Sequence, residues 1–131
     1  MLFLDDVKNW LKQFGIAQNY YVSKLDSKRE KSLGVYQRKT PSAPIIAIGQ
    51  DSSYEIKPIS ILLHWNKNAV ETEKAAYELY KQLRAVSSFE INGTRIQMLL
   101  LLQSEPIDVG TDSDGVYERV IEFDLYYERN D

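Results

Sequence analysis

The last third of the chain alternates between apolar and polar positions with a period of two. One set of alternate positions is mainly apolar: Tyr117, Arg119, Ile121, Phe123, Leu125 and Tyr127. The intervening set is rich in acids: Glu118, Val120, Glu122, Asp124, Tyr126 and Glu128. Because successive side chains of a strand point to opposite sides of a sheet, residues 116–129 are predicted to form one long strand with an apolar and an acidic face.

Two other segments have the 3.6-residue periodicity of amphipathic helices. The first runs from Leu2 to Phe14 and is ended by Gly15. The second runs from Ala69 to Val86, with Asn68 as the expected N-cap and Glu71 as its capping-box partner. The buried stripe predicted for the second helix is Ala76, Leu79, Tyr80, Leu83 and Val86.

Two β-like runs near the N-terminus, residues 19–25 and 32–38, flank the charged segment Asp26-Ser27-Lys28-Arg29-Glu30-Lys31. This arrangement predicts a hairpin with a charged tip. The basic side chains of the tip suit a contact with phosphate or with an acidic partner. The acids interleaved with them favour the alternative, a solvated turn.

The middle of the chain combines a predicted loop with a long strand. Residues 39–44 contain two prolines and predict a loop, and a short apolar run follows at 45–48. Residues 54–65 then predict a long strand with Ile59, Ile61, Leu63 and Trp65 on one face. Pro58 weakens the first half of this strand, which is therefore expected at an edge of the sheet or bulged.

Asn92-Gly93 is the strongest hairpin signal in the chain, and it joins residues 89–91 to residues 95–103. The second of these runs is apolar on both sides. Alternation places Leu99 and Leu101 on one face, and it places Ile96, Met98, Leu100 and Leu102 on the other. Such a strand is central between two layers or is covered by another subunit.

The order of these elements predicts an α+β fold, with a mixed, largely antiparallel sheet and two helices packed on one face. A length of 131 residues fits a single domain over residues 1–131. The uncovered sheet face is expected to carry the oligomer-interface candidates Leu99, Leu101, Val120 and Tyr126. Beside them lies the acidic row Glu118, Glu122, Asp124 and Glu128, read as a solvated face or as an acidic wall that lines a lumen or meets a partner.

Composition narrows the function. A net charge of −3 argues against broad clamping of nucleic acid, which needs a basic face. The absence of cysteine excludes disulfides and thiolate metal sites. No apolar run is long enough to span a membrane, and the acids Asp5 and Asp6 argue against a secretory leader.

Candidate chemistry is sparse. His64 is the only histidine, lies within a predicted strand, and is interpreted as structural. Asp112-Ser113-Asp114-Gly115 resembles part of a calcium loop but fails at both ends of the pattern, so a plain turn is favoured. The acidic row could be read as paired catalytic carboxylates, although it is a regular strand stripe. The sequence therefore predicts no catalytic, cofactor-binding or metal-binding residues.

From Ile59 onward the chain resembles the minor capsid and tail-terminator proteins of long-tailed bacteriophages. The resemblance lies in a succession of segments rather than in one motif. These segments are Ile59–Trp65, Asn68–Ala76, Ile91–Ile96, Ser104–Asp112 and Tyr117–Arg129. The basic tip at Lys28-Arg29-Glu30-Lys31 has no counterpart in the resemblance.

The resemblance implies a non-enzymatic structural protein that forms a ring, typically of six subunits, at the head-proximal end of the tail tube. Such a ring ends tube growth and docks on the head connector. The implied partners are identical subunits, the tail-tube protein and connector proteins, with DNA passing through and no membrane. The implied location is the virion, after assembly in the cytoplasm of a bacterial host.

Other functions fit the same features. A head–tail joining protein or another minor capsid protein would have similar size and architecture. A cytoplasmic module that binds a protein at a sheet edge is a further alternative. A small hydrolase that uses the carboxylates is a third, and it would lose activity on substitution of Glu122 and Asp124.

Overall fold

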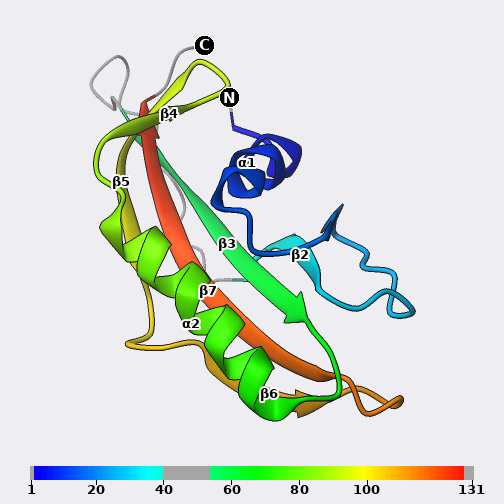
Figure 1. Cartoon of the computed structure of the whole chain (residues 1–131). Helices are drawn as coiled ribbons and strands as arrows, with labels where there is room; N and C mark the ends of the chain where they lie inside the picture. Colours follow the sequence, from blue (N-terminus) through cyan, green and yellow to red (C-terminus); the bar gives the residue numbers. More distant parts are fainter. Residues whose placement is uncertain (1, 40–53, 129–131) are drawn as a thin grey trace.

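The computed structural model describes residues 2–39 and 54–128, and within them a single twisted sheet carries helices on one face (Figure 1). In chain order the elements are α1 (Leu4–Leu11), the 3₁₀ helix η1 (Lys12–Phe14), β1 (Asn19–Val22), β2 (Ser32–Gln37), β3 (Tyr54–His64), α2 (Ala69–Ala85), β4 (Phe89–Ile91), β5 (Thr94–Leu101), β6 (Ile107–Thr111) and β7 (Tyr117–Glu128). This is the predicted α+β class.

The order of strands across the sheet is β1-β2-β3-β7-β5-β4, and β6 pairs with the start of β7. Each pair is antiparallel except β1 with β2. The longest pairing joins β3 to β7, from Tyr54 opposite Glu128 to His64 opposite Glu118. The predicted long alternating strand is thus the centre of the sheet, and it has the predicted register of inward and outward side chains.

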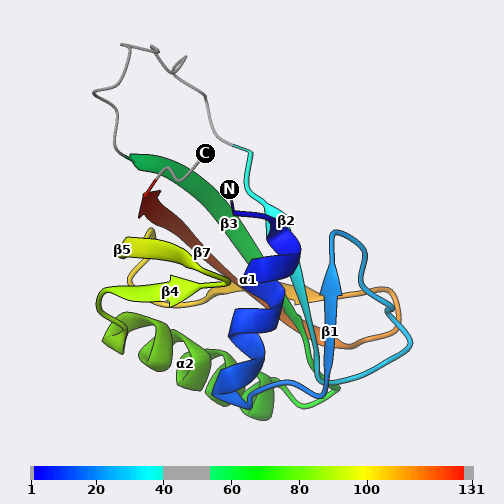
Figure 2. The same cartoon turned by 90° about the horizontal axis from the view of Figure 1, so that it is seen from above.

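The hydrophobic core lies between the sheet and the two α-helices, which cover the same face (Figure 2). Its fully buried side chains come from both helices and from the strands: Val7, Leu11, Leu33, Val35, Ile59, Ile61, Leu63, Ala76, Leu79, Leu83, Ile96, Ile121, Phe123 and Leu125. Trp10 of α1 stacks on Phe89 of β4 at 4.8 Å between ring centroids. No helix of the described residues lies on the opposite side of the sheet, which we call the open sheet face.

Both predicted helices are present, with one local difference at α2. The Asn68 side chain accepts hydrogen bonds from the backbone N–H groups of Val70 and Glu71, as expected of an N-cap. The predicted capping box is wrong. The Glu71 carboxylate accepts a hydrogen bond from the Asn66 amide instead, and the Asn68 backbone N–H donates to the Asn66 side chain.

The predicted hairpin near the N-terminus is wrong, because β1 and β2 run parallel, with Asn19 opposite Ser32 and Val22 opposite Val35. Residues 23–31, which we call the basic loop, carry the chain back to the starting end of β1. The Lys31 N–H donates to the Trp65 carbonyl at 2.8 Å, and the Ser27 carbonyl bonds the His64 ring. These bonds to the end of β3 favour a loop over a tight turn.

A β-bulge changes the faces to which the side chains of β5 point. Ile96 pairs with Tyr127 and Met98 pairs with Tyr126, so Gln97 is an extra residue with no partner on β7. Beyond the bulge the alternation is reversed. Leu99 and Leu101 therefore pack against the core, and the prediction that they lie on the uncovered face is wrong.

Pro58 lies where the described pairing of β3 with β2 ends. The last residue pair is Gln37 with Ile59, the Pro58 carbonyl accepts from the Arg38 N–H, and residues 54–57 have β7 as their described sheet neighbour, which agrees with an edge and shows no bulge against β7. The Asn92-Gly93 hairpin is also confirmed, and both turn residues have the positive φ that its turn requires. The predicted loop beyond residue 39 and the apolar run at 45–48 lie outside the described residues.

Candidate functional site

The open sheet face is the first candidate site, because it carries the acidic row of β7. Glu118, Glu122, Asp124 and Glu128 all point to this side, as predicted. Each of them has a partner within the described residues. The Gln103 amide donates to Glu122 at 2.9 Å, and the Gln97 amide donates to Glu128 at 3.3 Å, where the Arg95 guanidinium lies 3.9 Å away.

The strongest of these pairings joins Asp124 to Arg38. The guanidinium donates to the carboxylate at 2.5 Å, and both side chains are more than four-fifths buried. The Arg38 Nε is buried without a hydrogen-bond partner among the described residues, so Asp124 is the main partner of this guanidinium. At this position the charge of the acidic row is therefore balanced by a cation of the same chain.

His64 ties three segments together at the end of the sheet. Its Nδ1 lies 2.9 Å from a Glu118 carboxylate oxygen and 3.7 Å from one of Asp112, and its Nε2 donates to the Ser27 carbonyl at 2.8 Å. The ring is fully buried. Both ring nitrogens therefore face oxygen acceptors. The interpretation of His64 as a structural residue agrees with these contacts.

Apolar side chains are exposed on the open sheet face beside these acids. Met98 is 44% exposed and Leu100 is 41% exposed, on the side of β5 that faces away from the helices. Ile56 of β3 is 47% exposed and lies in the same cross-strand row as Tyr126 and Met98. The predicted interface residues Val120 and Tyr126 share this face but are partly buried. Because of the bulge at Gln97, the exposed apolar residues of β5 on this face are Met98 and Leu100, and not the predicted Leu99 and Leu101.

Asp112, in the loop before β7, accepts hydrogen bonds within its own turn. One Asp112 carboxylate oxygen accepts hydrogen bonds from the backbone N–H groups of Asp114 and Val116. These bonds, above all that from Val116, lower the pKa of Asp112, and the nearby His64 acts in the same direction. Among residues 2–39 and 54–128, no group of three or more His, Asp or Glu side chains is placed to hold a metal ion. The predicted plain turn agrees with these bonds.

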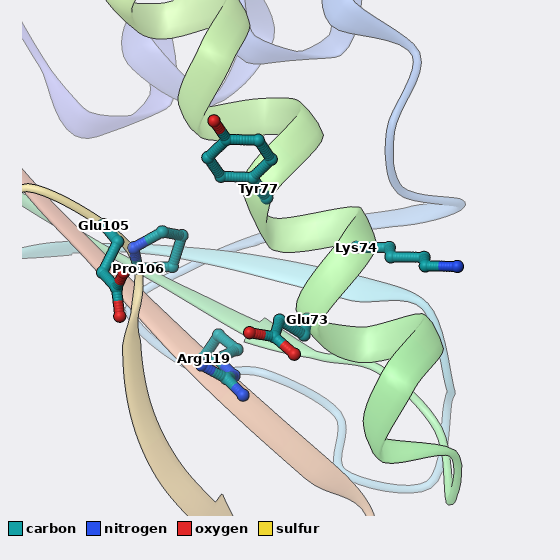
Figure 3. A pocket seen from close by; sticks show the side chains of 6 residues that line it. All are labelled: Glu73, Lys74, Tyr77, Glu105, Pro106 and Arg119. Carbon is teal, nitrogen blue, oxygen red and sulfur yellow. The ribbon is translucent and has the colours of Figure 1, made fainter.

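A second candidate site lies on the helical side, between α2 and the segment that joins β5 to β6. Figure 3 shows its six lining side chains: Glu73, Lys74, Tyr77, Glu105, Pro106 and Arg119. We call this the Arg119 pocket, and its volume is about 320 Å³. Arg119 lies on its floor, 16% exposed, with one guanidinium nitrogen 3.6 Å from the Asp108 carboxylate.

Sequence reasoning missed the Arg119 pocket, although it left a signal. Arg119 is the one charged side chain on the apolar face of β7, where a cation needs a compensating environment. Its ion-pair partner is Asp108, and the residues that line the pocket with it come from α2 and from residues 105–106, which no local pattern connects to β7. Among the described helices, none is both long enough and apolar enough to cross a membrane.

Comparison with known proteins identifies the family. The model for the bacteriophage tail terminator protein family matches residues 10–129, which is nearly the whole chain. The chain belongs to this family. Its members are structural proteins of phage particles, so the resemblance seen from Ile59 onward is confirmed and extends over the N-terminal half.

The other comparisons add little. The search of curated proteins gives no match. Among solved structures, this tail terminator is similar to the gp17 protein of bacteriophage SPP1, with 11% sequence identity and a TM-score of 0.43. The similarity covers 97% of this chain and 85% of the gp17 chain. A likeness of this size carries no argument about function.

Proposed function

We propose that this tail terminator forms a ring of identical subunits, typically six, at the head-proximal end of the tail tube. The ring ends tube growth and joins the tail to the head connector, and DNA passes through it without specific contacts. The observation that carries the proposal is the family match over residues 10–129. In this role the protein acts without catalysis, within the virion, after assembly in the host cytoplasm.

The open sheet face supports the part of this proposal that concerns association. Exposed Met98, Leu100 and Ile56 share one face with partly buried Tyr126. Large exposed apolar side chains gathered on one face are typical of surfaces that another protein covers. The net charge of −3 disfavours retention of DNA inside a ring, since phosphate is repelled by negative charge.

The test measures assembly in the presence of the tube protein. Sedimentation over a wide range of concentrations is expected to give a closed oligomer, and tube lengths measured by electron microscopy are expected to be shortened and uniform. Leu100→Lys is expected to weaken assembly, because it places a charge in the apolar patch. Phe3→Lys is the control, since Phe3 is also exposed but lies at the start of α1, away from the open sheet face. Monomers alone, with tubes of unregulated length, would contradict the proposal.

A further inference from the structure

The basic loop carries four basic and two acidic side chains and lies beside β1 at one edge of the sheet (Figure 2). The Lys28 ammonium has no partner among the described residues. Arg29 is 65% exposed, and its one ion-pair partner within residues 2–39 and 54–128 is Asp26, at 3.7 Å. The loop therefore presents two cations to a partner.

The backbone of the basic loop is held in place although its tip is charged and exposed. The Ser27 carbonyl accepts from the buried His64 ring, and the Arg29 carbonyl accepts from the Ser32 hydroxyl at 2.7 Å. The Asp26 carboxylate accepts from the Lys28 N–H at 3.0 Å. A loop that is already ordered loses little conformational entropy when it binds.

The Arg119 pocket has the complementary charge. The carboxylates of Glu73 and Glu105 make no hydrogen bond or ion pair with residues 2–39 or 54–128, and they lie on opposite walls (Figure 3). The charge of Arg119 is already met by Asp108. In Figure 3 the Lys74 ammonium points away from the pocket. Two free carboxylates suit a cationic side chain. The Tyr77 ring beside them already has the Lys81 ammonium 5.7 Å from its centroid.

The two features are separate surfaces of the molecule, because the basic loop bonds the His64 ring on the open-face side of the sheet, whereas the Arg119 pocket lies on the helical side. The basic loop follows β1, which is one end of the strand order, whereas the Arg119 pocket is built on β7, α2 and the β5–β6 connection (Figure 1). A two-fold contact pairs a surface with itself. A head-to-tail contact pairs two different surfaces, and it closes into a ring when the rotation permits. Opposite charges on two separate surfaces favour the second kind.

We propose that the basic loop of one subunit enters the Arg119 pocket of the next, with Lys28 and Arg29 paired to Glu73 and Glu105. This inference rests on the proposed ring and names its subunit contact. A second acidic hollow, at Asp5, Asp6 and Glu90, is a weaker acceptor. There Asp5 is already paired with Lys8, and Asp6 accepts from the Phe3 N–H and from the Asn92 amide.

Cysteine cross-linking tests the contact directly, because the natural chain has no cysteine. The variant Arg29→Cys/Glu105→Cys, assembled with tube protein and oxidised, is expected to give a ladder of linked subunits that ends at the ring. A mixture of the two single variants is expected to give only dimers. Either single variant alone is expected to give monomers. Ser88→Cys/Glu105→Cys is the matched control and is expected to give no ladder.

Charge reversal provides the second measurement. Lys28→Glu/Arg29→Glu and Glu73→Lys/Glu105→Lys are each expected to raise the concentration for half-assembly by about tenfold or more, because like charges then meet. All four substitutions in one chain are expected to restore assembly. Lys12→Glu/Lys67→Glu makes the same change of charge at other exposed positions, and it is expected to leave assembly within about twofold of the natural chain.

The outcomes separate this contact from the proposed function. If rings form but the double-cysteine variant gives no ladder and charge reversal has no effect, the contact is wrong and the ring stands. If Arg29→Cys alone gives dimers, the contact is two-fold and the inference is overturned. If the natural chain forms no ring with tube protein, the proposed function fails first, and this inference fails with it.

Discussion

Two groups of carboxylates in this tail terminator differ in what surrounds them. On the open face of β7, Glu118, Glu122, Asp124 and Glu128 each have a partner within the chain. Across the molecule, Glu73 and Glu105 line the Arg119 pocket without a partner among the described residues. The regular acidic stripe therefore helps to hold the fold. Glu73 and Glu105 remain free for another molecule, and no sequence pattern emphasised them.

The spacing of charges along a strand predicts which face its carboxylates share. It does not predict whether those carboxylates are already paired within the chain. Asp124 is paired by Arg38, 86 residues away, and Glu118 by His64, 54 residues away. Removing the partner of a partly buried carboxylate lowers the stability of the fold, because the desolvation of the carboxylate is then no longer compensated. Substitutions should therefore separate the two groups, with stability affected at the first and assembly at the second.

The largest effect is expected at His64. His64→Ala leaves Glu118 partly buried without its partner and releases the Ser27 carbonyl, so the free energy of unfolding should fall by about 3 kcal/mol. Urea denaturation measures this. Glu118→Gln in the same background should recover part of the loss, because a neutral amide costs less to leave unpaired. If the double variant is as unstable as the sum of the single variants, Glu118 is not coupled to His64.

A smaller effect is expected at Arg38. Arg38→Met keeps most of the stem but leaves Asp124 unpaired, and it should lower the free energy of unfolding by about 2 kcal/mol. Adding Asp124→Asn should reduce that loss. Lys57→Met, on the neighbouring strand β3, is the control and should change stability little, because it makes no ion pair among the described residues. If Arg38→Met and Lys57→Met lower the free energy of unfolding equally, the ion pair of Arg38 with Asp124 does not account for the loss.

Low pH should reduce the free energy of unfolding in part through protonation of Asp112, whose pKa is lowered by its backbone hydrogen bonds and by His64. A carboxyl group with a lowered folded-state pKa stabilises the protein above its unfolded pKa, and that stabilisation is lost as the pH falls through the folded value. The free energy of unfolding at pH 7 and at pH 3 should therefore differ less for Asp112→Asn than for the natural chain. An equal difference would contradict the assignment.

The smallest effect on stability is expected in the Arg119 pocket. Glu73→Gln and Glu105→Gln should change the free energy of unfolding by less than about 0.5 kcal/mol, because neither carboxylate is paired within the described chain. Thermal denaturation of the monomer measures this, beside the assembly assay in which the pair of substitutions should have its effect. A marked loss of stability would show that these acids belong with those of β7.

Much of the site could not be read from the sequence. The stripe on β7 correctly placed Glu118, Glu122, Asp124, Val120 and Tyr126 on one face. The exposed positions of β5 were assigned to the wrong side, because Gln97 forms a bulge that no pattern marks. Local periodicity stays informative only while strand pairing is regular, and a single inserted residue reverses every side chain beyond it. The Arg119 pocket needed contacts between β7, α2 and the β5–β6 connection.

By itself, the sequence determined both helices, the long strands β3 and β7, the hairpin at Asn92-Gly93 and the α+β class. These features depend on spacing along the chain, which the chain carries locally. Only the tertiary structure decided that β1 runs parallel to β2, that Leu99 and Leu101 turn inward, and which carboxylates are paired. The physical reason is that each of these outcomes depends on a hydrogen bond, ion pair or strand register between residues far apart in the chain.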